Sequence, residues 1–451
     1  MIDVLIVGAG LAGLVAADTL VAEGMQVTVL EARDRVGGRT LNERIDESHV
    51  VEMGGQWIGP TQDRVRALVD RLGLETYPTF IDGDTVAEAG GQRYRYLGPM
   101  PKLSPLVVAD IAQAVWRLER MSEKIPLGRP WDAPNARELD FQTFESWIRK
   151  YCKTAFGREH FRTCAQVIFS ANAARLSLFH VAFYFKSAGS MNAIIMTEHG
   201  AQQDRVVGGS QLISERLAQK LGPVVRLNEP VRSITYREDQ VKVSTGSVEY
   251  SAKRCIVALP PTLAGRLVYS PAMPSLRDQL TQATPMGAVI KCQAVYESPF
   301  WRDEGLNGSA VYQDGPLQVV FDNSPHASPY GVLLGFVDGA HATELSKLSA
   351  KARERVVLDC LVRFFGRRAG VPIKYLEKDW SADEYSRGGY GAHFPPGVWS
   401  TVGSALREPV GPVHWAGSET AERWSGYMDG AVSSGERAGR EVLASLMARQ
   451  L

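Results

Sequence analysis

The sequence predicts a two-domain α/β protein. One domain is expected to be a Rossmann-like α/β domain built from three separated segments, and the other an α+β domain of mixed sheet and helix. Three observations lead to this prediction. The chain opens with a strand, glycine turn, helix and strand pattern; it returns twice to such patterns after helix-rich stretches; and its 451 residues are too many for one simple core. The predicted segments are 1–77, 206–283 and 383–451 for the first domain, and 78–205 and 284–382 for the second.

The N-terminal unit carries the strongest of these patterns. An apolar run at 4–7 predicts a buried strand, and glycines follow it directly. We expect a helix over 14–22 and, after Gly24, a second parallel strand over 27–30. Such a strand–turn–helix–strand unit binds dinucleotides when glycines and an acidic residue stand at the right places.

The glycines and the acid stand at those places. Gly8 permits the tight turn, Gly10 lets a pyrophosphate approach the backbone, and Gly13 lets helix and strand pack closely, with Ala12 inside the same turn. The helix N-terminus offers free N–H groups to the phosphates. Glu31, at the tip of the second strand, is expected to accept hydrogen bonds from a ribose diol. These residues predict a dinucleotide cofactor.

A second glycine turn follows the acid and indicates which dinucleotide. The stretch E-A-R-D-R-V-G-G-R-T, from Glu31 to Thr40, resembles the FAD signature of the flavin amine oxidases. NAD dehydrogenases lack this extension. Arg33 and Arg39 are therefore cofactor-binding candidates, and Arg39 is well placed to reach the pyrophosphate.

Composition excludes several other classes. Fifty basic and fifty acidic side chains balance, which gives no reason to expect nucleic acid or an anionic membrane as a partner. Five scattered cysteines, none in C-x-x-C spacing, disfavour a disulfide framework and a metal site. A first strand beginning at Ile2 leaves no room for a signal peptide, and no apolar run of about 18 residues is present. We therefore expect a soluble cytoplasmic protein.

The remaining elements follow from periodicity and turn residues. Phe179, Phe183, Tyr184 and Phe185 form an aromatic cluster at partly helical spacing, which we interpret as helical core. Helices are predicted at 62–72, 107–125, 141–151, 211–221, 349–365 and 427–448, and strands at 224–227, 231–237, 241–243, 255–259, 289–296, 318–322, 332–337 and 413–416.

Resemblance to the monoamine oxidases extends over nearly the whole chain. Besides the N-terminal unit, it is densest at G-G-Q-W-I-G-P-T-Q (54–62), at V-I-K-C (289–292) and in the C-terminal stretch 386–435 with its W-S-G-Y-M-D-G motif. The resemblance implies that Tyr390 and Tyr427 form two aromatic walls in front of the flavin, and that Lys291 reaches flavin N5 through a water. Two facing phenol rings would admit a neutral amine and fix its direction.

Further cofactor contacts are implied by the same resemblance. Gly389 stands where the mitochondrial members carry the cysteine that attaches FAD, so FAD is expected to be bound non-covalently. Those members also end in a membrane-anchoring helix, which is not expected here. The implied contacts are Gly55, Gln56 and Trp57 along the flavin, Val231 at the adenine end, Trp380 beside the ring, Gly417 and Glu419 by the ribityl chain, and Met428 at the start of the last helix.

The substrate is expected to be a primary amine with an apolar or aromatic group. Ile195 and Gln202 match pocket positions of monoamine oxidases, and Val319 lies in an apolar stretch where diamine oxidases use carboxylates. Oxidation to imine and aldehyde would reduce O₂ to H₂O₂. The alternatives are a polyamine, an L-amino acid or an alkaloid amine as substrate, a desaturase-like reaction, or a non-catalytic flavin-binding subunit. A homodimer is a family expectation.

Overall fold

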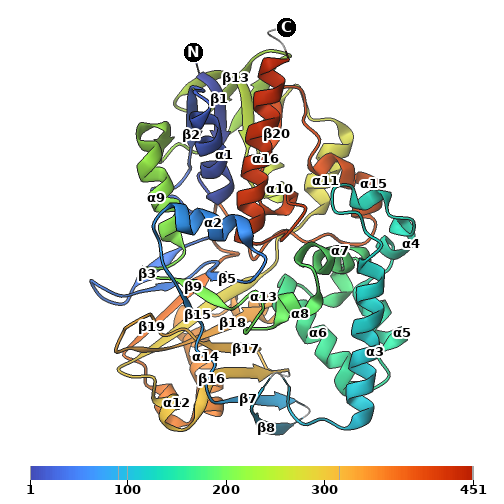
Figure 1. Ribbon diagram of the computed structural model, residues 1–451, viewed down its shortest axis with the longest axis vertical. Coiled ribbons are helices and arrows are strands. Elements are labelled where there is room, and N and C mark those ends of the chain that lie inside the picture. Colours follow the sequence, from blue (N-terminus) through green and yellow to red (C-terminus); the bar gives the residue numbers. More distant parts are fainter. Residues whose placement is uncertain (1, 90, 99, 314, 449–451) are drawn as a thin grey trace.

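The computed structural model of the chain describes residues 2–89, 91–98, 100–313 and 315–448, so the outer ends of the first and last predicted segments lie outside the described residues. Two large sheets organise it. Figure 1 shows the eight-stranded sheet in the half that holds β1 and α16, and the seven-stranded sheet in the opposite half, with a group of helices beside the latter.

The eight-stranded sheet draws its strands from three separated parts of the chain. Strands β1, β2, β10 and β20 run parallel to their neighbours, and the last four residues of β1 and all of β2 are buried, as expected where both faces of a parallel sheet are covered. The order is β10 (Val225–Arg226), β2 (Val27–Leu30), β1 (Ile2–Val7), β13 (Glu249–Val257), β12 (Val241–Ser244), β11 (Ser233–Tyr236) and β14 (Val268–Ser270), with β20 (Val413–Trp415) paired to β13.

Helices α1 (Leu11–Ala22), α9 (Gln211–Leu221) and α16 (Met428–Met447) cover one face of this sheet. Small residues let α1 and α16 approach closely, because a Cβ on Gly435 would lie 2.3 Å from the Ala12 carbonyl oxygen. Helix α1 begins three residues earlier than predicted. The Gly10 carbonyl already accepts a bond from Leu14 N, so the turn glycines, which lack helical propensity, are followed at once by helix.

The seven-stranded sheet is antiparallel apart from one pair, β7 with β16. Its centre is covered on both faces: β15 and β18 are buried along their whole length. The order is β19 (Lys374–Asp379), β15 (Val289–Tyr296), β18 (Gly331–Asp338), β17 (Val319–Asp322), β16 (Leu306–Tyr312), β7 (Asp84–Ala89) and β8 (Gln92–Tyr96), and α14 (Ala350–Phe365) packs on one face.

Several helices of the group beside the seven-stranded sheet begin at side-chain caps, which sequence periodicity does not show. Ser104, Thr143, Thr154 and Ser177 each accept a bond from a first-turn N–H, so the helices predicted to begin at 107 and 141 begin instead at Pro105 and Phe144. The helices of the group are α3 (Pro105–Ser122), α4 (Ala136–Asp140), α5 (Phe144–Tyr151), α6 (Ala155–Phe169), α7 (Leu178–Ala188) and α8 (Met191–Ile195).

Smaller elements connect these parts. A ladder of β3 (Asn42–Arg44) with β4 (Val50–Glu52), and another of β5 (Trp57–Ile58), β9 (Asp204–Val206) and β6 (Thr76–Pro78), lie between the two large sheets in Figure 1. The other helices are α2 (Asp63–Arg71), α10 (Pro261–Ala264), α11 (Ser275–Ala283), α12 (Phe300–Asp303), α13 (Gly339–Leu345) and α15 (Val398–Val402).

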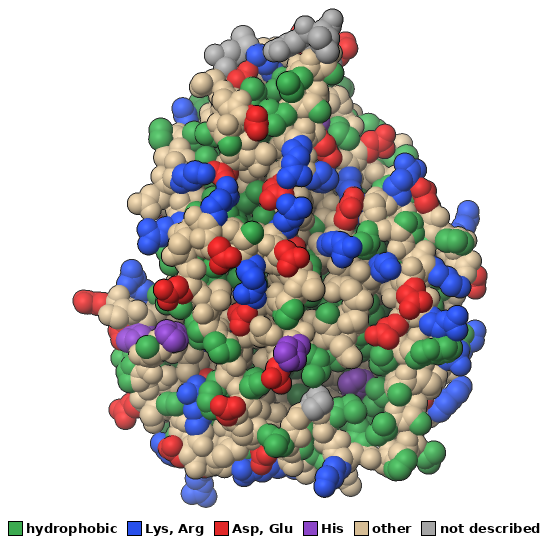
Figure 2. All heavy atoms as spheres, viewed as in Figure 1, with side chains coloured by type: hydrophobic (Ala, Val, Ile, Leu, Met, Phe, Trp, Pro, Cys, Tyr) green, Lys and Arg blue, Asp and Glu red, His purple; other side chains and the backbone are tan. Residues whose placement is uncertain are grey.

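The predicted fold class is confirmed: a Rossmann-like sheet assembled from three segments stands beside a part of mixed sheet and helix. The exact domain boundaries remain a prediction. Across the part of the chain that the structure describes, no helix has both the length and the apolar character needed to span a membrane. Figure 2 shows lysine, arginine, aspartate and glutamate side chains intermingled over the visible face, in keeping with the balanced charge of the sequence.

Candidate active site

One cavity of about 1180 Å³ extends from the glycine turn after β1 to the helices α6 and α8. Its lining therefore includes residues from both large sheets and from the helical group. Of the sequence-predicted site residues, the cavity brings together all but two. Gly13 and Glu419 stand behind other lining residues and support them.

The glycine turn forms the narrow end of the cavity. Gly8 has φ +100°, a conformation that favours glycine, and a Cβ on Gly13 would lie 2.0 Å from the Gly8 carbonyl oxygen. Helix α1 then starts with Gly10 as an N-cap that offers no side-chain bond. Its first N–H groups are thus left for a ligand at the cavity wall, as a bound pyrophosphate requires.

Glu31 and Arg33 flank this end. The Glu31 carboxylate is buried and accepts hydrogen bonds from Ala9 N (2.8 Å) and Arg33 N (3.0 Å), which fixes its orientation toward the turn. The Arg33 guanidinium is already engaged, because it donates to Asp383 and, at 2.8 Å, to Ser386 Oγ. Arg33 therefore lines the cavity and also connects the end of β2 to the segment 383–386, which precedes Tyr390.

Arg39 and Glu419 form an ion pair in which Glu419 is buried and Arg39 is partly buried, a contact that the sequence did not predict. Nη1 and Nη2 of Arg39 lie 2.6 and 3.0 Å from the two Glu419 oxygens, and Nη1 also donates to the Tyr390 carbonyl oxygen at 2.8 Å. Burial acts to lower the pKa of Arg39, but the Glu419 carboxylate outweighs this and raises it. Arg39 therefore stays charged at the cavity wall and holds the backbone of a predicted cage residue.

Two tryptophans mark the middle of the cavity. Trp380 Nε1 donates to the Met53 carbonyl oxygen at 2.9 Å, whereas the buried Trp57 Nε1 has no hydrogen-bond partner. Val231, Gly55 and Gly417 also line the cavity. Helix α16 starts at Met428, and its N-cap, Tyr427, provides no side-chain bond. A second uncapped helix start at the cavity wall fits a cofactor with polar atoms at its ring end, as FAD has.

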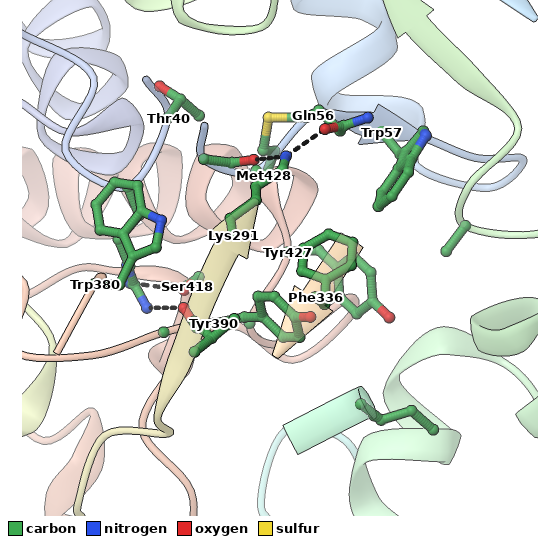
Figure 3. Close-up of a pocket in the computed structure, with 18 of the residues that line it drawn as sticks. Thr40, Gln56, Trp57, Lys291, Phe336, Trp380, Tyr390, Ser418, Tyr427 and Met428 are labelled. Atoms are coloured by element: carbon green, nitrogen blue, oxygen red, sulfur yellow. Dashed lines mark hydrogen bonds between the residues drawn. The ribbon is translucent and has the colours of Figure 1, made fainter. Parts of the chain in front are cut away.

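The aromatic rings of Tyr390, Phe336 and Tyr427 stand around the space next to Lys291 (Figure 3). Tyr390 packs edge-on against Phe336, with ring centroids 5.7 Å apart, and Tyr427 contacts the ring of Tyr184 at 5.9 Å. Tyr184 was predicted to be helical core together with its phenylalanine neighbours. That prediction is wrong for Tyr184, which lines the cavity, and correct for Phe179, Phe183 and Phe185, which are buried in core clusters.

Lys291 points inward from β15 and is buried with 2% of its surface exposed. Its Nζ donates to the Gly54 carbonyl oxygen at 2.8 Å and to Gln56 Oε1, a bond that is drawn in Figure 3. Burial is the main cause that lowers the pKa of Lys291 to about 7. Near neutral pH a substantial fraction of this amine is therefore uncharged and able to accept a proton.

The far end of the cavity is mainly apolar. Ile195, Gln202 and Val319 line it, together with Ile168 and Ile194. Sequence reasoning missed Phe336, Tyr184 and Ile168, because only the fold shows that β18, α7 and α6 face this space; β18 is almost uniformly apolar and has no alternation that would single out Phe336. Among the described residues no group of three or more His, Cys, Asp or Glu side chains could hold a metal ion.

Comparison with known proteins gives consistent matches. Residues 11–443 match the family model described as flavin containing amine oxidoreductase. A Mycobacterium tuberculosis protein named as a flavin-containing monoamine oxidase is 41% identical over 445 residues, which cover 99% of this chain and 97% of that protein. Horse amine oxidase [flavin-containing] A is 37% identical over 99% of this chain and 86% of its own.

Solved structures agree with this. Wild-type putrescine oxidase bound to putrescine has a TM-score of 0.94 at 36% identity and covers 98% of this chain and 99% of its own. Cyclohexylamine oxidase from Brevibacterium oxydans IH-35A has a TM-score of 0.95 at 31% identity, with 99% of both chains covered.

Proposed function

This chain belongs to the flavin-containing amine oxidoreductase family and is an FAD-dependent amine oxidase, and we propose that its substrate is a primary monoamine with an apolar or aromatic group. The observation that carries the proposal is the composition of the cavity beyond the tyrosines. Isoleucine, valine and phenylalanine side chains form most of the walls next to Tyr390 and Tyr427. Such walls favour an apolar substituent over a charged one.

FAD, when bound, accepts the two electrons and the hydrogen of the amine α-carbon and passes the electrons to O₂. The protein's part is orientation. The faces of Tyr390 and Tyr427 would attract the amine nitrogen and hold the α-carbon in one direction. Lys291 Nζ would hold or accept a proton beside the reacting atoms. These residue roles are part of the proposal.

The positions of the carboxylates that line the cavity favour a monoamine over a diamine as the substrate. Among the described lining residues the carboxylates are Glu31, Asp82, Glu198 and Glu384. Glu31 lies at the glycine turn, and the other three are exposed. A buried carboxylate at the far end, which would neutralise a second ammonium group away from water, is not among them. A diamine is the second candidate, because a neighbour of this fold is named putrescine oxidase.

The test is anaerobic mixing of the purified protein with separate amines while the flavin absorbance at about 450 nm is recorded. The panel contains benzylamine, tyramine, an aliphatic monoamine, putrescine, spermidine and several L-amino acids. Rapid bleaching by the monoamines alone supports the proposal. Faster bleaching by putrescine or an amino acid would overturn the substrate class, and a band that no amine bleaches would favour a flavin-binding subunit without turnover.

A further inference from the structure

A chain of three buried amides runs from Lys291 away from the cavity. Gln56 accepts from Lys291 and donates through Nε2 to Asn323 Oδ1 at 2.6 Å. Asn323 Nδ2 donates to Gln293 Oε1 at 2.9 Å, and Gln293 Nε2 donates to the Glu52 carbonyl oxygen at 2.7 Å. We propose that Gln56, Asn323 and Gln293 form a one-directional amide relay that positions Lys291 and sets its basicity.

The direction of the relay is fixed at its far end. The Glu52 carbonyl oxygen can only accept, so Gln293 must turn its NH₂ group toward it and its oxygen toward Asn323. The same requirement passes through Asn323 to Gln56, which must then present its oxygen to Lys291. Asn323 and Gln293 are fully buried and do not line the cavity, so water cannot reverse this order.

Lys291 consequently has two acceptors behind it and the cavity in front. Both the Gly54 carbonyl and Gln56 Oε1 require an N–H from Nζ. The rings of Trp57 and Phe336 flank the nitrogen, with centroids 5.8 and 5.4 Å away. When Lys291 is neutral, its two N–H groups serve these acceptors and its lone pair points into the cavity. When Lys291 is protonated, its third N–H points there.

The relay also acts on the charge of Lys291. Each amide turns its negative oxygen end toward the nitrogen, which favours the ammonium form against the burial that opposes it. The charged groups nearby are Glu52 and Arg205, which pair with each other at 2.6 Å and act on Lys291 in opposite directions. Their opposite effects on the pKa of Lys291 partly cancel. The amide dipoles are the part of this environment that a substitution by a neutral side chain can change.

Asn323 is the position that tests the relay, because it touches neither the cavity nor Lys291. Asn323→Leu removes both bonds and frees Gln56 to rotate, so the pKa of Lys291 should fall by about 1. Asn323→Ala makes the same deletion with a smaller side chain. A pKa shift at Lys291 caused by a neutral substitution that touches neither Lys291 nor the cavity is a signature that a merely structural role would not give.

The measurement is an NMR titration of the oxidised holoenzyme labelled with ¹³C at the lysine ε-carbon. The Lys291 resonance is identified by its loss in Lys291→Met. Gln113→Leu is the matched control, since Gln113 on α3 donates to two backbone carbonyl oxygens and does not line the cavity, and it should leave the pKa of Lys291 unchanged. An unchanged or raised Lys291 pKa in Asn323→Leu overturns the proposal.

The smaller Asn323→Ala keeps the test decisive even where Asn323→Leu does not fold. Relevance to turnover rests on the role proposed above for Lys291, but the titration does not. If the Lys291 pKa moves as expected and no amine reduces the flavin, the proposed function fails and the relay stands. If amines are oxidised and the pKa does not move, the relay fails alone.

Discussion

Asp338, at the end of β18, is a buried carboxyl group whose ionisation should weaken the fold. It has no exposed surface; Ser170 Oγ donates to its Oδ1 at 2.8 Å, while its Oδ2 has no hydrogen-bond partner. Burial raises the pKa of Asp338 from 3.8 to about 8, and the Ser170 and Tyr390 hydroxyls offset part of that rise. The unpartnered Oδ2 is the natural place for the proton that the folded protein retains.

The sign of the pH effect follows from proton linkage. Between pH 3.8 and about 8 the folded state keeps a proton on Asp338 that the unfolded state has released, so the free energy of unfolding falls as pH rises through this range. At about 1.4 kcal/mol per pKa unit the full effect is roughly 6 kcal/mol, and relaxation around the buried charge reduces it. Asp338→Asn removes this titration.

The assay is urea unfolding, followed by fluorescence at pH 5, 6, 7 and 8, for the parent and for Asp338→Asn. Relative to the parent, the variant should gain stability steadily with pH, by several kcal/mol over this range. Asp70→Asn makes the same chemical change on an exposed position of α2 and serves as the control. Parallel pH profiles for the parent and Asp338→Asn would refute the assignment of a protonated, buried Asp338.

Three further predictions concern the cofactor and the amine. Lys291→Met should slow flavin reduction or reoxidation by about 10²-fold or more while FAD stays bound, and unchanged rapid-reaction kinetics would remove Lys291 from the proposed site. Gly13→Ala should abolish FAD binding or folding, because its Cβ would lie 2.0 Å from the Gly8 carbonyl oxygen; a yellow, stable variant protein would contradict the close packing of helix and strand. Acid precipitation should leave yellow FAD in the supernatant, since Gly389 offers no side chain for attachment, whereas a yellow pellet would show a covalent bond.

Local patterns predicted most of the secondary structure. The strand at 289–296 and the helix at 211–221 have the predicted bounds, because each is an uninterrupted periodic run between turn residues. Helix α1 was predicted to start too late, since its first residues belong to the glycine turn. The inward direction of Lys291 could be argued from its apolar neighbours alone, and its burial on β15 agrees.

The sequence by itself determined the dinucleotide-binding turn and the order of the elements, because glycine geometry, apolar periodicity and capping act between residues close in the chain. Only the tertiary structure decided which side chains meet at the cavity. The Arg39–Glu419 pair joins residues 380 positions apart, and the Gln56–Asn323 bond joins residues 267 positions apart. No local signal marks such partners, since their pairing depends on how two sheets pack together and on which polar groups burial leaves unsatisfied.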